Sequence, residues 1–175
     1  LNTYLEIRYF EEKYGNQSIL NLSTGKSKIN LDIQHEDVHR VSYQFNASRN
    51  YDQPMQMGSP EFTSMNYGGI VYSKTGIGFH YLKDYLGEDL FDNCMHTYFD
   101  KWKFKHPKPH DLEEVFSLKC EKNLSWFFDD YVNTTNKVDY QIKRVKKINE
   151  TQYLVRLKNN RGIPGPTNIV HLTKG

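Results

Sequence analysis

Apolar side chains recur along most of this chain at spacings of three and four residues, as they do on the buried face of a helix. Residues 1–14 carry such a face, and Gly15 supplies a stop directly after it. The same periodicity is strong over residues 67–131. Residues 16–66 contain repeated loop signals and predict one or two helices. The pattern therefore predicts a mainly α fold for this part of the chain.

Four helices are expected within the strongly periodic region. Two of them follow from two apolar stripes, which consist of Ile77, Tyr81, Leu82, Tyr85 and Leu86, and of Phe91, Met95, Tyr98, Phe99 and Trp102. Gly87 separates the stripes. Pro109 suits the first turn of a third helix, and residues 124–131 predict a short fourth one.

The pattern changes after residue 136. Residues 140–145 and 153–157 alternate between apolar and polar side chains, which predicts a β-hairpin, and a third strand is expected near residues 169–172. Three strands are too few for independent stability. We therefore expect a helical domain over residues 1–135 and a short antiparallel β segment over residues 136–175 that begins a further domain.

Composition excludes several classes of function. Charged residues make up 25% of the 175 residues and the net charge is +2, so no basic face predicts nucleic-acid binding. No apolar stretch approaches eighteen residues, so no membrane span is expected. The chain starts at Leu1 without a signal-peptide pattern, which favours an excised segment or a processed chain. Six Asn-x-Ser/Thr sequons give slight support to an extracytoplasmic or secreted location.

The two cysteines do not have the spacing of metal ligands. Cys94 and Cys120 each lie within an apolar helical pattern. We therefore expect two buried free thiols.

The most informative segment is Tyr72-Ser-Lys74-Thr-Gly76, a Tyr-x-Lys-x-Gly signature at the start of an amphipathic helix. Three further blocks accompany it in order, and they are Leu1-Asn-Thr-Tyr-Leu-Glu6, the stretch from Tyr98 to Leu112 with its His-Pro-Lys-Pro run, and Asn123-Leu-Ser-Trp-Phe-Phe128. Together these blocks resemble the gluzincin zinc aminopeptidases, the aminopeptidase N family. The resemblance implies the helical C-terminal part of a thermolysin-like catalytic domain. One departure is Lys108, where the family often has a hydroxyl residue that caps the following helix.

The resemblance implies a role for each residue near the signature. It makes Tyr72 the catalytic residue that donates a hydrogen bond to the transition-state oxyanion, a task that suits a phenol whose pKa near 10 keeps it protonated. Tyr67 is a candidate substrate-binding residue, with core packing as the alternative. Lys74 is expected to orient the turn or to pair with a carboxylate. The glutamate that serves as third zinc ligand would lie just upstream of Leu1, so zinc belongs to a longer parent protein and no metal is expected on this segment.

A second histidine motif competes with that interpretation. His35-Glu36-Asp37-Val38-His39 fits the bare His-Glu-x-x-His pattern, which on a helix places two imidazoles on one face. The charged Asp37 stands where zincins have an inward-packing residue, and no glutamate follows at the family's usual distance. The motif also comes after the segment that it precedes in the family. A chance match on a solvated helix face is therefore expected.

The resemblance thus predicts a fragment of a zinc metallopeptidase that removes N-terminal residues from peptides. The fragment would contribute Tyr72 to the catalytic site and would be inactive in isolation. Its partners would be peptide substrates, reached through the parent protein, and the missing N-terminal half of the catalytic domain. Two alternatives stay open. One is a self-contained metal-binding protein that uses His35 and His39, and the other is a non-catalytic, peptidase-like interaction domain.

Overall fold

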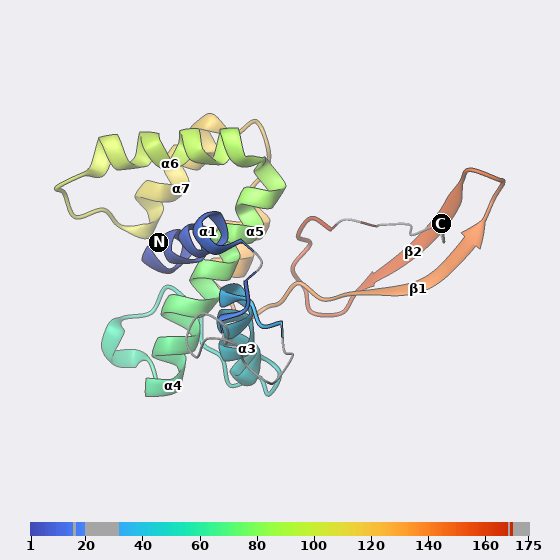
Figure 1. The fold of residues 1–175 in the computed structure, drawn as a ribbon, viewed down its shortest axis with the longest axis horizontal. Coiled ribbons are helices and arrows are strands. Elements are labelled where there is room, and N and C mark those ends of the chain that lie inside the picture. The colour runs from blue at the N-terminus through green and yellow to red at the C-terminus, as the bar shows by residue number, and fades with distance from the viewer. Residues whose placement is uncertain (16, 20–31, 168, 170–175) are drawn as a thin grey trace.

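The computed structural model describes residues 1–15, 17–19, 32–167 and 169, and the fold is mainly α (Figure 1). The helical elements, in chain order, are α1 (Asn2–Tyr14), α3 (His35–Ala47), the 3₁₀ turn η1 (Ser59–Glu61), α4 (Ser64–Asn66), the π-helix η2 (Tyr67–Lys74), α5 (Thr75–Leu86), α6 (Glu88–Trp102), α7 (Pro109–Lys119) and the π-helix η3 (Trp126–Val132). Two strands follow, β1 (Tyr140–Lys147) and β2 (Tyr153–Asn159).

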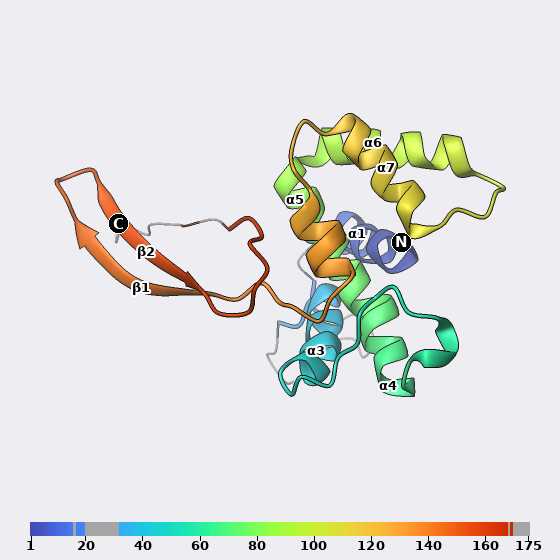
Figure 2. The ribbon, with the colours of Figure 1, turned by 180° about the vertical axis from the view of Figure 1, so that it is seen from behind.

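Helix α5 runs through the middle of the helical body and connects its two ends. In both views α6 and α7 lie together at one end, α3 and α4 lie at the other, and α1 crosses α5 between them (Figures 1 and 2). The core is built mainly from α5, α6, α7 and η3, with Tyr4 reaching in from α1. Burying large aromatic rings supplies most of the free energy that holds such a layer together.

The predicted helices are confirmed. α1 ends at Gly15, which has a positive φ of 56° and whose N–H donates to the carbonyl of Glu11 at 2.9 Å. Leu82, Leu86 and Phe91 are buried, as the two stripes require. Phe99 is wrong as a core position, because its side chain is 62% exposed. It lies eight residues after Phe91 and is therefore turned about 80° around the helix from it.

The two cysteines are buried, as predicted, and their thiols are free. Cys94 on α6 and Cys120 at the end of α7 bring their Sγ atoms to 3.8 Å. Burial, together with the neighbouring Cys120 thiol, raises the pKa of Cys94 to about 12. Both sulfur atoms therefore act as small apolar groups that join α6 to α7.

The β-hairpin is confirmed, and it projects from the helical body (Figure 2). β1 and β2 pair antiparallel, with Tyr140 opposite Asn159 and Lys147 opposite Tyr153. Its attachment is both polar and apolar, since Lys137 contacts Asp52 at 3.1 Å and the fully buried Ile163 belongs to the hydrophobic core. Residues 168 and 170–175 lie outside the described part of the chain, so the third strand stays a prediction, as does the domain boundary near residue 136.

Helix α3 carries the His-Glu-Asp segment, but the expectation of a solvated face is wrong. His35, Glu36 and His39 are only partly exposed, because they face polar side chains of α1 and α5. The apolar residues Val38, Val41 and Phe45 are instead exposed, between 44% and 65%. The polar face of α3 is thus the one that packs inward. In the described part of the chain, no helix is both long and apolar enough to cross a membrane.

Candidate functional site

Tyr72 lies on the π-helix η2, which is buried on one side and open on the other. Gly69, Ile70, Ser73 and Lys74 form the buried side. Gly69 approaches the backbone of α3 closely, since a Cβ there would lie 3.3 Å from the carbonyl oxygen of Ser42. The Tyr72 side chain is 47% exposed. The turn therefore fixes the backbone of Tyr72 while leaving its phenol accessible.

Tyr67 shares the open side of η2 with Tyr72. The two ring centroids lie 5.7 Å apart, with the ring planes at 70°. In an α-helix, residues five positions apart point about 140° away from each other. The wider π-turn, which is closed by i→i+5 hydrogen bonds, brings them onto one face. The π-winding is thus the reason that the two phenols are neighbours.

The contact between the two phenols affects the ionisation of Tyr72. Hydrogen bonding to Tyr67, followed by electrostatic repulsion from it, raises the pKa of Tyr72 above its ordinary value of 10. Tyr72 is therefore protonated throughout the neutral range and can act as a hydrogen-bond donor.

Lys74 lies below this turn, in the core. It is fully buried between the rings of Tyr43 and Tyr131, at 6.0 and 4.9 Å from their centroids. Its Nζ donates to the carbonyl of Thr134 at 3.1 Å, and its own carbonyl accepts a hydrogen bond from the Tyr131 hydroxyl at 3.0 Å. Its hydrogen bond goes to a backbone carbonyl rather than to a carboxylate. Lys74 therefore ties η2 to the end of η3.

Burial lowers the pKa of Lys74 from 10.5 to about 8. The folded state then holds this proton less tightly than the unfolded state, so the free energy of unfolding should rise as pH increases from about 8 to about 10. A pKa shift of this size corresponds to a change of at most about 3 kcal/mol in the free energy of unfolding. We expect equilibrium denaturation to show this rise most clearly as the difference between the wild type and Lys74→Met, because the Cys94 thiol and then the tyrosines ionise in the unfolded chain above about pH 8.5 and lower the stability of both proteins. Lys74→Met should remove it, and an equal rise in the variant would contradict the assignment.

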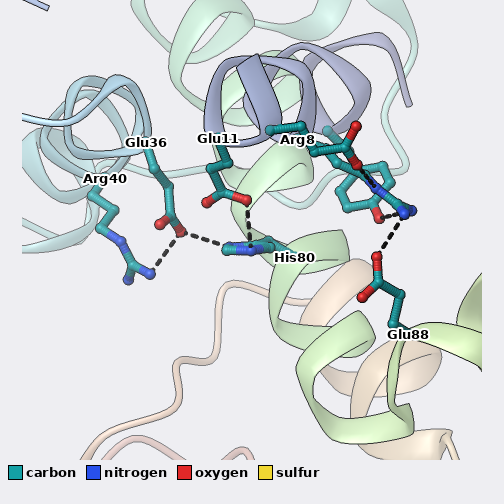
Figure 3. A network of polar contacts seen from close by, with 8 residues as sticks. Arg8, Glu11, Glu36, Arg40, His80 and Glu88 are labelled. Carbon is teal, nitrogen blue, oxygen red and sulfur yellow. Dashed lines mark hydrogen bonds and ion pairs between the residues drawn. The ribbon is translucent and has the colours of Figure 1, made fainter. Parts of the chain in front are cut away.

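A polar cluster joins α1, α3 and α5 and is centred on His80 (Figure 3). Nδ1 of His80 lies 3.1 Å from Oε1 of Glu36, and Nε2 lies 3.4 Å from Oε2 of Glu11. Arg40 contacts the same Glu36 oxygen at 2.6 Å. The hydrogen bond to Glu36 raises the pKa of His80 against the opposing effect of burial. His80 is therefore an ion-paired histidine within the interface between α1, α3 and α5.

A second cluster lies beside it and contains both motif histidines. Nε2 of His35 lies 3.2 Å from Oε1 of Glu6 on α1, and the His35 and His39 ring centroids are 5.2 Å apart. Ligand atoms of Glu6, His35 and His39 all fall within 4.8 Å of one another. In the zincin pattern the third ligand is an acidic residue downstream of the motif, whereas Glu6 lies upstream of it. Only the packing of α1 against α3 places Glu6 beside the two histidines.

Three other histidines lie elsewhere in the described part of the chain. His96, His106 and His110 are exposed, and the His110 side chain is 82% exposed. His171 falls outside the described residues. The described residues contain two groups of three potential metal ligands, one around His80 and one with His35 and His39, and Tyr72 belongs to neither.

A cavity with a volume of about 830 Å³ is separate from Tyr72. It lies where α3 and α5 meet the segment that leads to the hairpin. Tyr43, Tyr81, Tyr131 and Lys137 are among its lining residues, while Tyr67 and Tyr72 are not. Size alone therefore does not select the site that the sequence pattern indicates.

Comparison with known families identifies the class of protein. A family model described as "Peptidase family M1 domain" matches residues 1–131, which include η2 and Tyr72. Because the match covers 131 of 175 residues, this chain belongs to the M1 peptidase family. Family members are metallopeptidases and generally depend on zinc. Searches of curated proteins and of solved structures gave no match.

Proposed function

We propose that this chain is the C-terminal part of the catalytic domain of a zinc aminopeptidase, and that Tyr72 stabilises the oxyanion during peptide hydrolysis. The observation that carries the proposal is the Tyr72 phenol itself. It is protonated, half exposed, and held on a turn whose opposite side is buried in the core. Membership of the M1 peptidase family supports peptide hydrolysis as the reaction.

The chemistry divides between the chain and the zinc that the family implies. When bound, zinc polarises the scissile carbonyl and lowers the pKa of a water molecule. The resemblance assigns its ligands and the general-base glutamate to residues upstream of Leu1. Tyr72 contributes a directed O–H donor that meets the carbonyl oxygen as negative charge develops on it.

Tyr67 and the buried side of η2 serve this donor in different ways. Tyr67 limits where the Tyr72 ring can turn, because the two rings meet edge to face at 5.7 Å. The buried residues of η2 hold the backbone, so little reorganisation is needed as the transition state forms. We propose that Tyr67 also contacts substrate, since it is 38% exposed on the same face.

The test is to express the longer protein that contains this chain and to supply it with peptides that differ only at the N-terminus. A free α-amino group should permit stepwise release of single residues, whereas the N-acetylated peptide should be left intact. Mass spectrometry of the products distinguishes this result from internal cleavage. A chelator should abolish the activity, and zinc should restore it.

Two outcomes would oppose the proposal. Internal cleavage of both peptides would assign an endopeptidase activity instead. A folded, zinc-loaded protein that releases nothing would favour the non-catalytic interaction domain. The 175-residue chain serves as the negative control, because we expect no hydrolysis from it in the absence of the upstream residues.

A further inference from the structure

The cluster of Glu6, His35 and His39 contains nitrogen atoms that the fold buries without hydrogen-bond partners. Nε2 of His39 is buried and makes no hydrogen bond to any described residue. Nε2 of His35 makes no hydrogen bond either, although it lies 3.2 Å from Oε1 of Glu6 and forms an ion pair with that carboxylate when the imidazole is protonated. Leaving a buried nitrogen unpaired costs about 1–3 kcal/mol. The unpaired Nε2 of His39, next to the His35–Glu6 pair, therefore indicates a missing ligand.

Surrounding groups hold both imidazoles in fixed orientations. The His35 ring stacks on Phe10 of α1, with centroids 4.0 Å apart and ring planes at 12°. Nδ1 of His39 lies 3.2 Å from the Ser73 hydroxyl on η2. A contact of this kind on one ring nitrogen is typical of metal-ligating histidines, since it fixes the tautomer and aims the other nitrogen at the metal.

We propose that Glu6, His35 and His39 bind a divalent transition-metal ion of the Zn²⁺ type, at a site that this chain forms without upstream residues. Two imidazoles and one carboxylate are a common zinc ligand set that leaves a fourth position for water. Donors about 2.1 Å from one tetrahedral ion lie roughly 3.4 Å apart, and the His35–Glu6 pair already has a separation of 3.2 Å.

The neighbouring group of Glu11, Glu36 and His80 is a weaker candidate for a metal site. Both nitrogens of His80 already face carboxylates, and Arg40 neutralises Glu36 (Figure 3). A metal ion there would displace an existing ion-pair network. At the proposed site, in contrast, it would satisfy the unpaired Nε2 of His39 and would displace only the single His35–Glu6 contact.

The arrangement assigns this metal a structural role rather than a hydrolytic one. In a His-Glu-x-x-His site the glutamate acts as general base, but Glu36 is turned toward His80 and Arg40. The ion would cross-link α1 to α3, and the His39–Ser73 contact extends that link to the residue beside Tyr72. The proposal does not depend on the proposed function and departs from the expectation that this segment binds no metal.

The test measures zinc on the 175-residue chain after dialysis against trace Zn²⁺ with excess Mg²⁺. We expect about one tightly bound zinc per chain, and close to none in a His35→Ala/His39→Ala variant. His96→Ala/His110→Ala is the matched control, since it removes two exposed histidines and should retain about one zinc. Co²⁺ titration with visible absorption provides a second readout, because tetrahedral coordination gives a distinct spectrum.

Two single substitutions guard against a loss of binding caused by unfolding. The Glu6 side chain is 52% exposed, so Glu6→Gln should leave the fold intact while weakening zinc binding. Ser73→Ala should weaken binding by about 10–100-fold, as expected for a group that orients a ligand. The proposal is overturned if the folded chain binds no zinc, if the His35/His39 variant binds as much as the wild type, or if the His96/His110 variant alone loses it.

Discussion

Replacing Tyr72 by phenylalanine should lower kcat by about 10²–10³-fold in the zinc-loaded longer protein, the loss typical of removing one oxyanion donor. The change deletes a single oxygen from a side chain that is 47% exposed, so packing within η2 is preserved. Because the hydrogen bond strengthens only as charge develops, kcat and kcat/KM should fall together while KM stays nearly constant. Steady-state kinetics on a short peptide with a free N-terminus measures both constants.

Tyr67→Phe is the matched control for that experiment. It removes a hydroxyl from the same face of η2 and leaves the Tyr72 donor in place. We expect its kcat to stay within about tenfold of the wild type, because it disturbs the donor's surroundings but not the donor. An unchanged kcat for Tyr72→Phe would remove Tyr72 from the mechanism, whereas equal losses for the two variants would assign the Tyr67 hydroxyl an equal part in it. Thermal unfolding of both proteins excludes a folding defect as the cause.

Phe127→Ala should lower the free energy of unfolding by about 3–5 kcal/mol. Phe127 is fully buried on η3 and stacks on Tyr131 with ring centroids 5.7 Å apart. It also meets Phe79 of α5 edge to face at 5.4 Å. Truncation therefore removes apolar contacts and leaves a cavity at the point where η3 packs on α5. Equilibrium denaturation of the 175-residue chain, followed by circular dichroism, measures the change.

Phe99→Ala provides the comparison, because the Phe99 ring is 62% exposed on α6. A surface truncation of this kind should change the free energy of unfolding by no more than about 0.5 kcal/mol. Similar losses for the two phenylalanine variants would mean that the core does not lie where α5 and η3 meet.

The helical part of the fold was largely predictable because local pattern and tertiary packing agree there. The stripe that contains Leu82 and Leu86 is buried as its periodicity requires, and Gly87 ends α5 with a positive φ of 88°. Pro109 begins α7, and the Asp111 carboxylate accepts a hydrogen bond from the Lys108 N–H, which is the N3 half of a capping box. These features depend on neighbours within one or two turns of the chain.

The relation between Tyr67 and Tyr72 was not predictable from periodicity. Helical spacing assumes 3.6 residues per turn, and at that spacing the two side chains diverge. No apolar repeat marks a π-turn, so only coordinates reveal that the two rings are in contact. Tyr72 itself was selected as a candidate through the motif around it, because a motif needs no assumption about winding.

The polar interface of α3 was missed for a different reason. A helix whose charged face packs inward and whose Val41 and Phe45 face outward reverses the usual rule. Glu6 lies 29 positions before His35, and no local signal connects them. Contacts of this kind arise from the crossing of two helices, and a single sequence does not specify which helices cross.

The buried thiols at the contact between α6 and α7 allow opening of the core to be measured by cysteine alkylation. Thiolates, not thiols, react with alkylating agents, and Cys94 is both fully buried and held protonated by a pKa of about 12. Cys120 is 7% exposed beside it. Alkylation therefore requires α6 and α7 to separate. The rate of alkylation measures how often this happens, and no introduced probe is needed.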